Sequence, residues 1–284
     1  MEGRRDRNSM KNRFSMDKSV TLITGAGGLL GLQHARAVLE MGSITILADI
    51  DDKSIKQNLH ILKEEFQRGI IYAFNVDVTN EVSVNNLIKQ ISSLGLIVNV
   101  LINNATINPK MKNSSGLEQS RLENFTVKQW DMEINVGLTG AFLCSKIFGS
   151  EMAKNDISGV IINIASDLSV ISPDQRLYRE VGIQESSQPV KPITYSVIKT
   201  GLVGLTKYLA TYWSGKQIRC NSLSPGGVYD NHSDEFVSRI SKLIPLGRMA
   251  NKEEYISAIQ FLCSDASSYM NGHNLVMDGG RTIW

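Results

Sequence analysis

"SVTLITGAGGLLGLQHARAVLEMG" (residues 19–42) is the stretch that decides the fold of this 284-residue chain. It opens with an apolar, β-branched run at 19–24, which predicts a buried strand. A glycine-rich turn follows at 24–31, and glycine lets a backbone turn tightly. Apolar residues at helical spacing then continue to Gly42, where the helix is expected to stop. A strand, a glycine-rich turn and a helix in this order predict a βαβ unit whose helix N-terminus can hold a phosphate group.

The rest of the chain repeats this alternation of strand and helix patterns. Strand-like apolar runs occupy residues 43–49, 69–77, 98–105, 158–166, 218–226 and 274–280. Helical patterns separate most of them, at about 53–68, 81–94, 126–154, 194–214 and 251–263. Strands alternating with helices predict parallel pairing with helices on both faces of the sheet. We therefore predict an α/β fold, a single Rossmann-like domain over residues 18–284 with a doubly wound, mostly parallel, seven-stranded sheet.

The composition excludes several classes of protein. With 42% apolar and 20% charged residues, the chain has the composition of a soluble globular protein. The net charge of +2 gives no basis for a nucleic-acid partner, and no apolar run approaches the roughly 18 residues of a membrane span. The three cysteines are odd in number and far apart, which favours a reducing cytoplasm over disulfides, and no histidine spacing suits a metal. Residues 1–17 are expected to form a disordered basic tail that carries Arg4, Arg5, Arg7, Lys11 and Arg13.

An acidic residue closes the second strand-like run. Asp49 stands where a carboxylate can accept hydrogen bonds from the adenosine ribose diol of a dinucleotide. A carboxylate there also repels a 2′-phosphate, and Arg36 is the only Arg or Lys in residues 24–49. We therefore predict NAD(H) rather than NADP(H) as the cofactor. The alternative role for Asp49 is that of a helix N-cap.

Tyr195 and Lys199 lie four residues apart at the start of a helix pattern, so they share one helix face. Interconverting an alcohol and a ketone needs an acid or a base at the substrate oxygen. A free tyrosine has a pKa of about 10, too high for a base near neutrality. A nearby ammonium favours the phenolate and is expected to lower the Tyr195 pKa toward the working pH. The alternative is a helix-surface pair without a catalytic role.

The same spacing recurs at Tyr212 and Lys216. These residues span Ser214 and Gly215, where the helix is expected to end. We interpret them as a helix terminus with a solvated lysine rather than a second catalytic pair.

Taken in order, these stretches resemble the short-chain dehydrogenase/reductase family over roughly residues 18–284. The family's glycine pattern is Thr-Gly-x-x-x-Gly-x-Gly, and Leu29 stands here at the middle glycine, which is expected to stiffen the turn and crowd the cofactor. Thr106 likewise replaces the glycine of the family's Asn-Asn-Ala-Gly. The resemblance continues through "DVT" (77–79), "INVGLTGAF" (134–142), "INIAS" (162–166), "SPGGV" (224–228), "LGR" (246–248) and "MDGG" (277–280).

The resemblance implies a role for each matching residue. Tyr195 becomes the general acid/base, and Lys199 also holds the nicotinamide ribose. Ser166 orients the substrate oxygen, and Asn135 positions a water that links Lys199 to solvent. The implied cofactor-binding set is Gly25, Gly28, Leu29, Leu30, Gly31, Asp49, Asp77, Val78, Asn104, Ala105, Thr106, Tyr195, Lys199, Pro225, Gly226 and Val228. The resemblance also implies a homodimer or homotetramer, in which Trp130, Met132, Phe142 and Phe148 are either helix core or an interface stripe.

Ser166 and Tyr195 are 29 residues apart in sequence, about twice the usual family spacing. The excess falls at about 172–192, which is long enough to be a functional loop. We expect a flap beside the substrate, with Ser166, Asp167, Arg176 and Tyr178 as substrate-binding residues. The charges of Arg179, Lys191, Lys110 and Lys112 suggest an anionic or sugar-like substrate. The alternative is a surface loop unrelated to the substrate.

These features predict an NAD(H)-dependent oxidoreductase that interconverts a secondary alcohol and a ketone on a small, sugar-like or anionic molecule. A looser resemblance, in "SDLSVISPDQRLY", "TYSVIK" and "YMNGHNLVMDGG", is to members from surface-sugar or flagellin-glycan biosynthesis. A sugar-acid (gluconate-like) dehydrogenase and a 3-oxoacyl-carrier reductase are alternatives. A catalytically idle dinucleotide-binding sensor or subunit is the alternative from another class, because Leu29, Thr106 and the long insertion depart from the family pattern.

Overall fold

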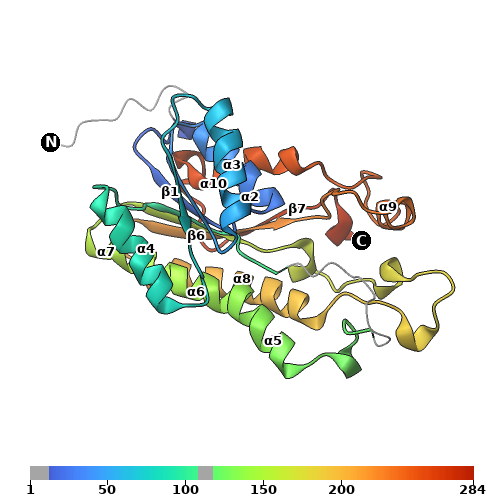
Figure 1. Cartoon of the computed structure of the whole chain (residues 1–284). Helices are drawn as coiled ribbons and strands as arrows, with labels where there is room; N and C mark the ends of the chain where they lie inside the picture. The colour runs from blue at the N-terminus through green and yellow to red at the C-terminus, as the bar shows by residue number, and fades with distance from the viewer. Residues whose placement is uncertain (1–12, 108–117) are drawn as a thin grey trace.

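Within residues 13–107 and 118–284, which the computed structural model describes, seven strands form one sheet with parallel neighbours throughout (Figure 1). The strands are β1 (Val20–Thr24), β2 (Ile44–Asp49), β3 (Ile71–Asn75), β4 (Val100–Asn103), β5 (Gly159–Ile164), β6 (Ile218–Pro225) and β7 (Asn274–Met277). Their order across the sheet is β3-β2-β1-β4-β5-β6-β7. The direction of winding reverses between β1 and β4, so ligands are expected at the carboxyl ends of these strands.

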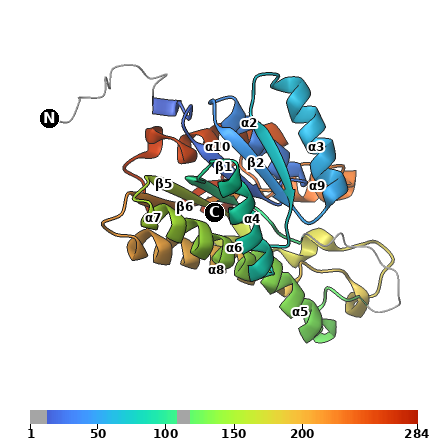
Figure 2. The ribbon, with the colours of Figure 1, turned by 60° about the vertical axis from the view of Figure 1, so that its left-hand side comes forward.

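Helices cover both faces of this sheet, as Figures 1 and 2 show. One face packs against α2 (Leu29–Leu39), α3 (Asp52–Glu65) and α10 (Ile256–Cys263). The other packs against α4 (Glu81–Ser93), a long helix over 127–154 and α8 (Ile193–Tyr212). Neighbouring residues of β1 enter opposite cores, since Leu22 joins the α4 side and Ile23 the α2 side. Burial on both faces is why the strands read as continuous apolar runs.

The predicted helix over 126–154 is confirmed as one continuous helical segment, although it is not regular. It consists of α5 (Val127–Ile134), α6 (Gly140–Cys144) and α7 (Ser150–Lys154). Two π-helical turns, Asn135–Thr139 and Ser145–Gly149, join these pieces. Such turns are rare and occur often at functional sites, and the first begins at the predicted catalytic residue Asn135.

Two further features differ from the sequence predictions. The tail prediction fails at Met16, which is 2% exposed in the core and donates its N–H to the carbonyl oxygen of Met41; residues 1–12 lie outside the described residues. The helix α9 (Asp234–Ser241) was not predicted. It has only eight residues, but Ser233 caps it by accepting a hydrogen bond from the N–H of Phe236. None of the helices that the structure describes is long and apolar enough to cross a bilayer.

The 172–192 segment contains short 3₁₀ turns and packs onto α9. Its turns are η5 (Gln175–Tyr178) and η6 (Glu185–Ser187). Leu177, 4% exposed, lies in a small core with Ile240 of α9. Arg239, also on α9, donates to the carbonyl oxygen of Leu177 at 3.4 Å. The insertion is therefore an ordered segment. Its packing against α9 was not predicted from the sequence.

Candidate active site

The predicted catalytic and cofactor residues come together at the carboxyl ends of the strands. The glycine turn follows β1, Asp49 ends β2, Ser166 follows β5 and Pro225 ends β6. Tyr195 and Lys199 lie in the first two turns of α8, which packs on β5 and β6. Parallel pairing therefore places segments that are far apart in the sequence along one edge of the sheet.

Gly25 is the position in the turn that requires glycine. Its φ of +63° is a conformation that residues with a Cβ rarely adopt. A Cβ there would also lie 2.7 Å from the Cα of Ala105. The Asn104 Nδ2 donates to the carbonyl oxygens of Gly25, at 2.9 Å, and Thr24, at 3.1 Å. The end of β4 thus holds the turn in the tight form that suits a pyrophosphate.

Leu29 is accommodated without a positive φ, and its expected stiffening of the turn and crowding of the cofactor stay predictions. It is the first residue of α2, it is 37% exposed, and it is not among the positive-φ residues. The crowded position is Gly31, where a Cβ would lie 2.4 Å from the carbonyl oxygen of Gly25. Gly28 caps α2 in an extended conformation, and Leu30 packs against the α2-side core. The first-turn amides of α2 lack intrahelical partners, so the turn fits a bound anion.

Asp49 lies directly against this turn. Its Oδ2 accepts from the N–H of Gly27 at 2.8 Å, and its Oδ1 accepts from the N–H of Asp51 at 3.0 Å. The N-cap of α3 is Asp51, which accepts from the N–H groups of Lys53 and Ser54. The N-cap alternative for Asp49 is therefore wrong, and its half-buried carboxylate fits a ribose diol beside the glycine turn.

The other predicted cofactor contacts lie on loops at the same edge. The Asp77 Oδ1 accepts from the N–H and the hydroxyl of Thr79, and Val78 is 7% exposed. Thr106 is exposed. Together with the glycine turn and Asp49, these residues fit a dinucleotide.

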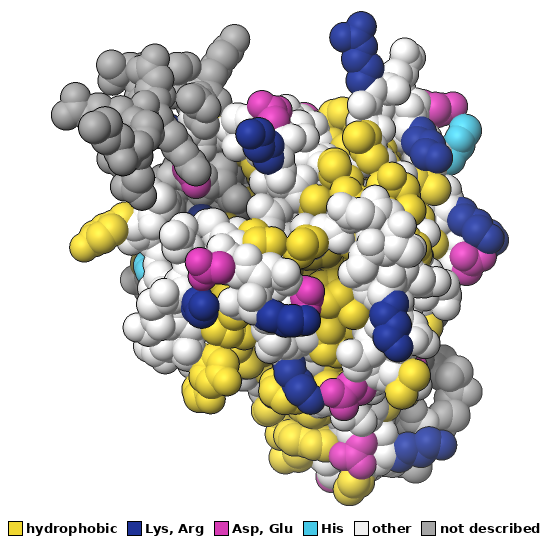
Figure 3. Space-filling view, turned by 90° about the vertical axis from the view of Figure 1, so that its left-hand side faces the viewer, with side chains coloured by type: hydrophobic (Ala, Val, Ile, Leu, Met, Phe, Trp, Pro, Cys, Tyr) yellow, Lys and Arg dark blue, Asp and Glu magenta, His cyan; other side chains and the backbone are white. Residues whose placement is uncertain are grey.

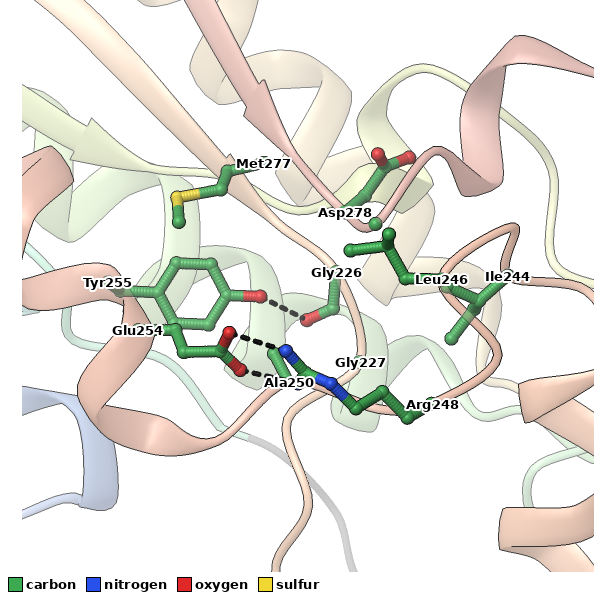
Figure 4. A pocket seen from close by; sticks show the side chains of 11 residues that line it. Gly226, Gly227, Ile244, Leu246, Arg248, Ala250, Glu254, Tyr255, Met277 and Asp278 are labelled. Carbon is green, nitrogen blue, oxygen red and sulfur yellow. Dashed lines mark hydrogen bonds and ion pairs between the residues drawn. The ribbon is translucent and has the colours of Figure 1, made fainter.

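A small cavity of about 90 Å³ lies beside the loop at 225–228, and residues near this cavity hold the loop in place (Figure 4). Tyr255 donates its hydroxyl to the carbonyl oxygen of Gly226 at 3.4 Å. Arg248 and Glu254, 2.7 Å apart, form an ion pair at the wall of the cavity. Val228 pairs with Ala250 in an isolated bridge. Neither Ser166 nor Tyr195 lines this cavity, so we assign it no part in the chemistry.

Ser166, Tyr195 and Lys199 form a compact group. Ser166 is 5% exposed, and its side chain lies close enough to Tyr195 to affect the pKa of that phenol. The Lys199 Nζ lies 5.7 Å from the ring centroid of Tyr195 and donates to the carbonyl oxygen of Ile164 at 2.8 Å. Two hydroxyls and an ammonium in this arrangement can hold a substrate oxygen and pass a proton to or from it.

The pKa of Tyr195 is raised in the structure, not lowered as expected. Desolvation by burial raises it most, the nearby Ser166 side chain lowers it, and the charge of Asp167 raises it. Burial and, to a smaller extent, the charge of Lys191 lower the pKa of Lys199 to about 7. Desolvation therefore dominates at both groups, because it disfavours the charged form of each.

Asn135 is exposed and begins the first π-helical turn. Its Oδ1 accepts from the hydroxyl of Thr139 at 3.3 Å. A water-mediated link between Asn135 and Lys199 stays a prediction.

The structure does not support two of the predicted substrate ligands. Both carboxylate oxygens of Asp167 are engaged by protein groups, and the residue is 3% exposed. The Arg176 side chain is 80% exposed and pairs with Asp174 at the surface. The ring centroid of Tyr178 lies 5.8 Å from that of Phe236, so Tyr178 packs between the flap and α9. Lys110 and Lys112 lie outside the described residues.

The second Tyr-x-x-x-Lys pair is a helix terminus, as predicted. Tyr212 is the last residue of α8 and is 63% exposed. Gly215 follows with a φ of +86°, and Lys216 pairs with Asp156 at 3.4 Å. Among residues 13–107 and 118–284, no cluster of His, Cys, Asp and Glu is arranged to hold a metal ion.

One charged residue at the site, Arg281, was not named in the sequence analysis, and the predicted flap residue Lys191 contacts Tyr195. The flap residue Lys191 lies with its Nζ 3.7 Å from the ring centroid of Tyr195, and burial lowers its pKa to about 8. Arg281, almost at the C-terminus, pairs with Asp167 at 2.7 Å. Arg281 and Asp167 are 114 residues apart in the sequence, so no local pattern reveals their contact, whereas Lys191 lies four residues before Tyr195.

Comparison with known proteins supports this picture. A family model described as enoyl-(acyl carrier protein) reductase matches residues 25–282. An NAD-dependent glycerol dehydrogenase of Listeria innocua is 28% identical, over 95% of this chain and 96% of its own length. A D-threitol dehydrogenase of Mycolicibacterium smegmatis is 28% identical over 95% of both chains.

Solved structures superpose over nearly the whole chain. A short-chain dehydrogenase of Leptospira borgpetersenii with bound NAD⁺ gives a TM-score of 0.80 at 26% identity, covering 99% of both chains. A gluconate 5-dehydrogenase of Burkholderia cenocepacia in complex with NADP and tartrate gives 0.81 at 25%, covering 97% of this chain and all, 100%, of its own. With the glycine turn and the Ser166–Tyr195–Lys199 group, these matches show that the chain belongs to the short-chain dehydrogenase/reductase family.

Proposed function

We propose that the protein is an NAD(H)-dependent oxidoreductase that interconverts a secondary alcohol and a ketone on a small polyol or sugar-like substrate. The observation that carries this proposal is the grouping of Ser166, Tyr195 and Lys199 beside the glycine turn, at one edge of the sheet. A cytoplasmic location, a single domain over 18–284 and the individual residue roles below are parts of the same proposal.

In this proposal, Tyr195 holds the proton that the substrate oxygen gains or loses, and Ser166 keeps that oxygen in place. Lys199 holds the cofactor's ribose while its other contact, the carbonyl oxygen of Ile164, fixes the ammonium. When bound, the nicotinamide ring accepts or supplies the hydride. Burial of the group excludes water, so each polar contact is stronger than it is in solvent.

The cofactor preference is proposed to follow from Asp49. Asp49→Asn removes the charge that repels a 2′-phosphate, and we expect the kcat/KM ratio for NADP⁺ over NAD⁺ to rise at least about tenfold, which is about 1.4 kcal/mol. Asp52→Asn is the matched control, because Asp52 is close by but pairs with Lys56. Steady-state rates with both cofactors measure the ratio. A parent enzyme that already prefers NADP⁺ tenfold contradicts this role for Asp49.

The substrate proposal rests on the two curated relatives described above, which act on glycerol and D-threitol, and on the polar flap. A screen of NAD⁺ reduction over polyols, sugar acids and sugar phosphates tests it, with 3-oxoacyl thioesters and NADH as the reverse-direction alternative. Turnover of none of these, together with tight NADH binding, favours the idle dinucleotide-binding alternative.

We propose that the chain forms a homodimer through the 127–154 helix and α8. Figure 3 shows hydrophobic side chains in its lower half as well as in its upper right, and Figure 1 places α5 and α8 in the lower part of the molecule. The exposed apolar residues of these helices include Val127, Met132, Phe142, Val197, Tyr208 and Tyr212. Phe148, by contrast, is 1% exposed and belongs to the core.

Phe142→Arg is expected to weaken this dimer. Phe142 is 47% exposed, and an interface hot spot contributes about 2 kcal/mol, or about 30-fold in Kd. Light scattering across a dilution series measures the change. Ile70→Arg, 50% exposed before β3, is the control that leaves the mass unchanged. A monomeric parent at high concentration removes the dimer proposal.

A further inference from the structure

A buried ion pair lies directly behind the hydroxyl of Ser166. The Asp167 Oδ2 accepts from the Arg281 Nη1 at 2.7 Å, and the two side chains are 4% and 7% exposed. Arg281 begins the short turn η9 (Arg281–Ile283) at the end of the chain. The pair therefore connects the C-terminal turn to the residue that follows Ser166.

The second oxygen of this carboxylate holds Ser166 itself. The Ser166 hydroxyl donates to the Asp167 Oδ1 at 2.8 Å, while the N–H of Leu168 donates to the same oxygen at 2.9 Å and to the Ser166 Oγ at 3.2 Å. The hydroxyl is thus held by one donated and one accepted hydrogen bond. Its remaining lone pair is available to a neighbouring O–H group.

We propose that Arg281 is a positioning residue that acts through Asp167 to orient the Ser166 hydroxyl and to offset the carboxylate's charge beside Tyr195. The proposal rests on the proposed oxidoreductase function and deepens it, because the C-terminal turn then sets how readily Tyr195 releases its proton.

Charged and titratable groups from every neighbouring element act on this proton. Lys199 on α8 and Lys191 at the end of the flap are cations that favour the phenolate. Asp167 opposes it, and the charges of Arg281, Tyr195 and Asp167 also act on the pKa of Tyr178 in η5. Glu133 on α5 and His232, in the loop after β6, lie near Lys191. Within this set, Asp167 is the charged group that contacts Ser166 directly.

Two single substitutions are expected to move the Tyr195 pKa in opposite directions. Arg281→Met leaves a carboxylate without its cation beside the phenol and raises the Tyr195 pKa by about one unit. Asp167→Asn removes the negative charge, leaves the Arg281 cation and lowers it by a similar amount. If the ion pair only stabilised the fold, the two variants would not shift the Tyr195 pKa in opposite directions.

The measurement is an ultraviolet titration of tyrosinate, in which the Tyr195→Phe form of each variant is subtracted so that only Tyr195 remains. It needs no substrate, so it decides the inference even if the proposed reaction fails. Circular dichroism first establishes that each variant is folded. Shifts of the same sign, or no shift in either folded variant, overturn the proposal.

A double variant covers the case in which a single variant does not fold. Asp167→Leu with Arg281→Met removes both charges together with the oxygen that holds the Ser166 hydroxyl, which avoids a lone buried ion. We expect it to fold, to keep the Tyr195 pKa of the parent, and to lose at least about tenfold in kcat with little change in KM, because the Ser166 hydroxyl is no longer oriented. A pKa displaced by a unit, or a kcat equal to that of the parent, contradicts the positioning role.

Discussion

Tyr195→Phe will lower kcat by about 10²–10⁴-fold, the usual contribution of a positioned acid or base. The substitution removes one hydroxyl and leaves the ring, so the contact with the Lys191 ammonium is kept. The glycine turn and Asp49 are untouched, so NADH should bind with the affinity of the parent. Rates of NAD⁺ reduction and a fluorescence titration with NADH measure the two quantities.

Tyr212→Phe is the matched control. It removes the same hydroxyl from the same helix, but at an exposed position at the end of α8. We expect no change in kcat. A Tyr195→Phe enzyme with more than a third of the parent's turnover contradicts the assignment of the acid/base.

Gly25→Ala will destabilise the protein by about 2–5 kcal/mol and abolish cofactor binding. The left-handed conformation costs a non-glycine residue about 1–2 kcal/mol, and overpacking costs about 1–3 kcal/mol more. The added Cβ would lie 2.7 Å from the backbone of Ala105, so β1 or β4 must move to accept it. Urea unfolding measures the free energy, and NADH fluorescence measures the binding.

Gly28→Ala tests the same turn without the clash. Gly28 has a φ of −81°, and the closest atom to an added Cβ, the carbonyl oxygen of Gly25, is 3.4 Å away. Gly28→Ala should lower the free energy of unfolding by less than about 1 kcal/mol, which is the difference between glycine and alanine at an N-cap. Equal losses of stability and of NADH affinity in the two variants would contradict the claim that the left-handed conformation of Gly25 requires glycine.

The sheet and the glycine turn were predictable because they depend on local pattern. The central strands are buried on both faces and read as apolar runs, and the glycine turn follows β1 directly in the sequence. The place of Asp49 followed in the same way, since it closes the strand beside β1. The terminal pair Tyr212 and Lys216 was interpreted correctly from the glycine that follows it.

The electrostatics of the site was not predictable in the same way. The expected fall of the Tyr195 pKa assumed a solvated phenol near an ammonium, whereas burial dominates in the structure. Arg281 lies 114 residues from Asp167, and no local pattern connects two such positions. The predicted ligands Asp167 and Arg176 were chosen for their charge, but one is held in a buried pair and the other faces solvent.

The flap shows the same limit of local pattern. Its length predicted a functional loop, but its packing depends on α9, a short helix with few residues to signal it. The rings of Tyr178 and Phe236 are 5.8 Å apart, and those of Phe236 and His232 are 5.1 Å apart. These contacts connect the flap to the segment after β6, so we infer that both segments together shape the substrate side of the site.

A crystal structure of the protein with NAD⁺ and a polyol that it oxidises decides whether the reaction occurs at this site. We predict that one substrate oxygen lies within about 2.6–3.2 Å of both the Tyr195 and the Ser166 hydroxyls, with the substrate carbon facing the nicotinamide and the ribose on Lys199. A substrate oxygen out of reach of Tyr195, or a nicotinamide ring bound away from the carboxyl end of β5, would contradict the proposed enzyme.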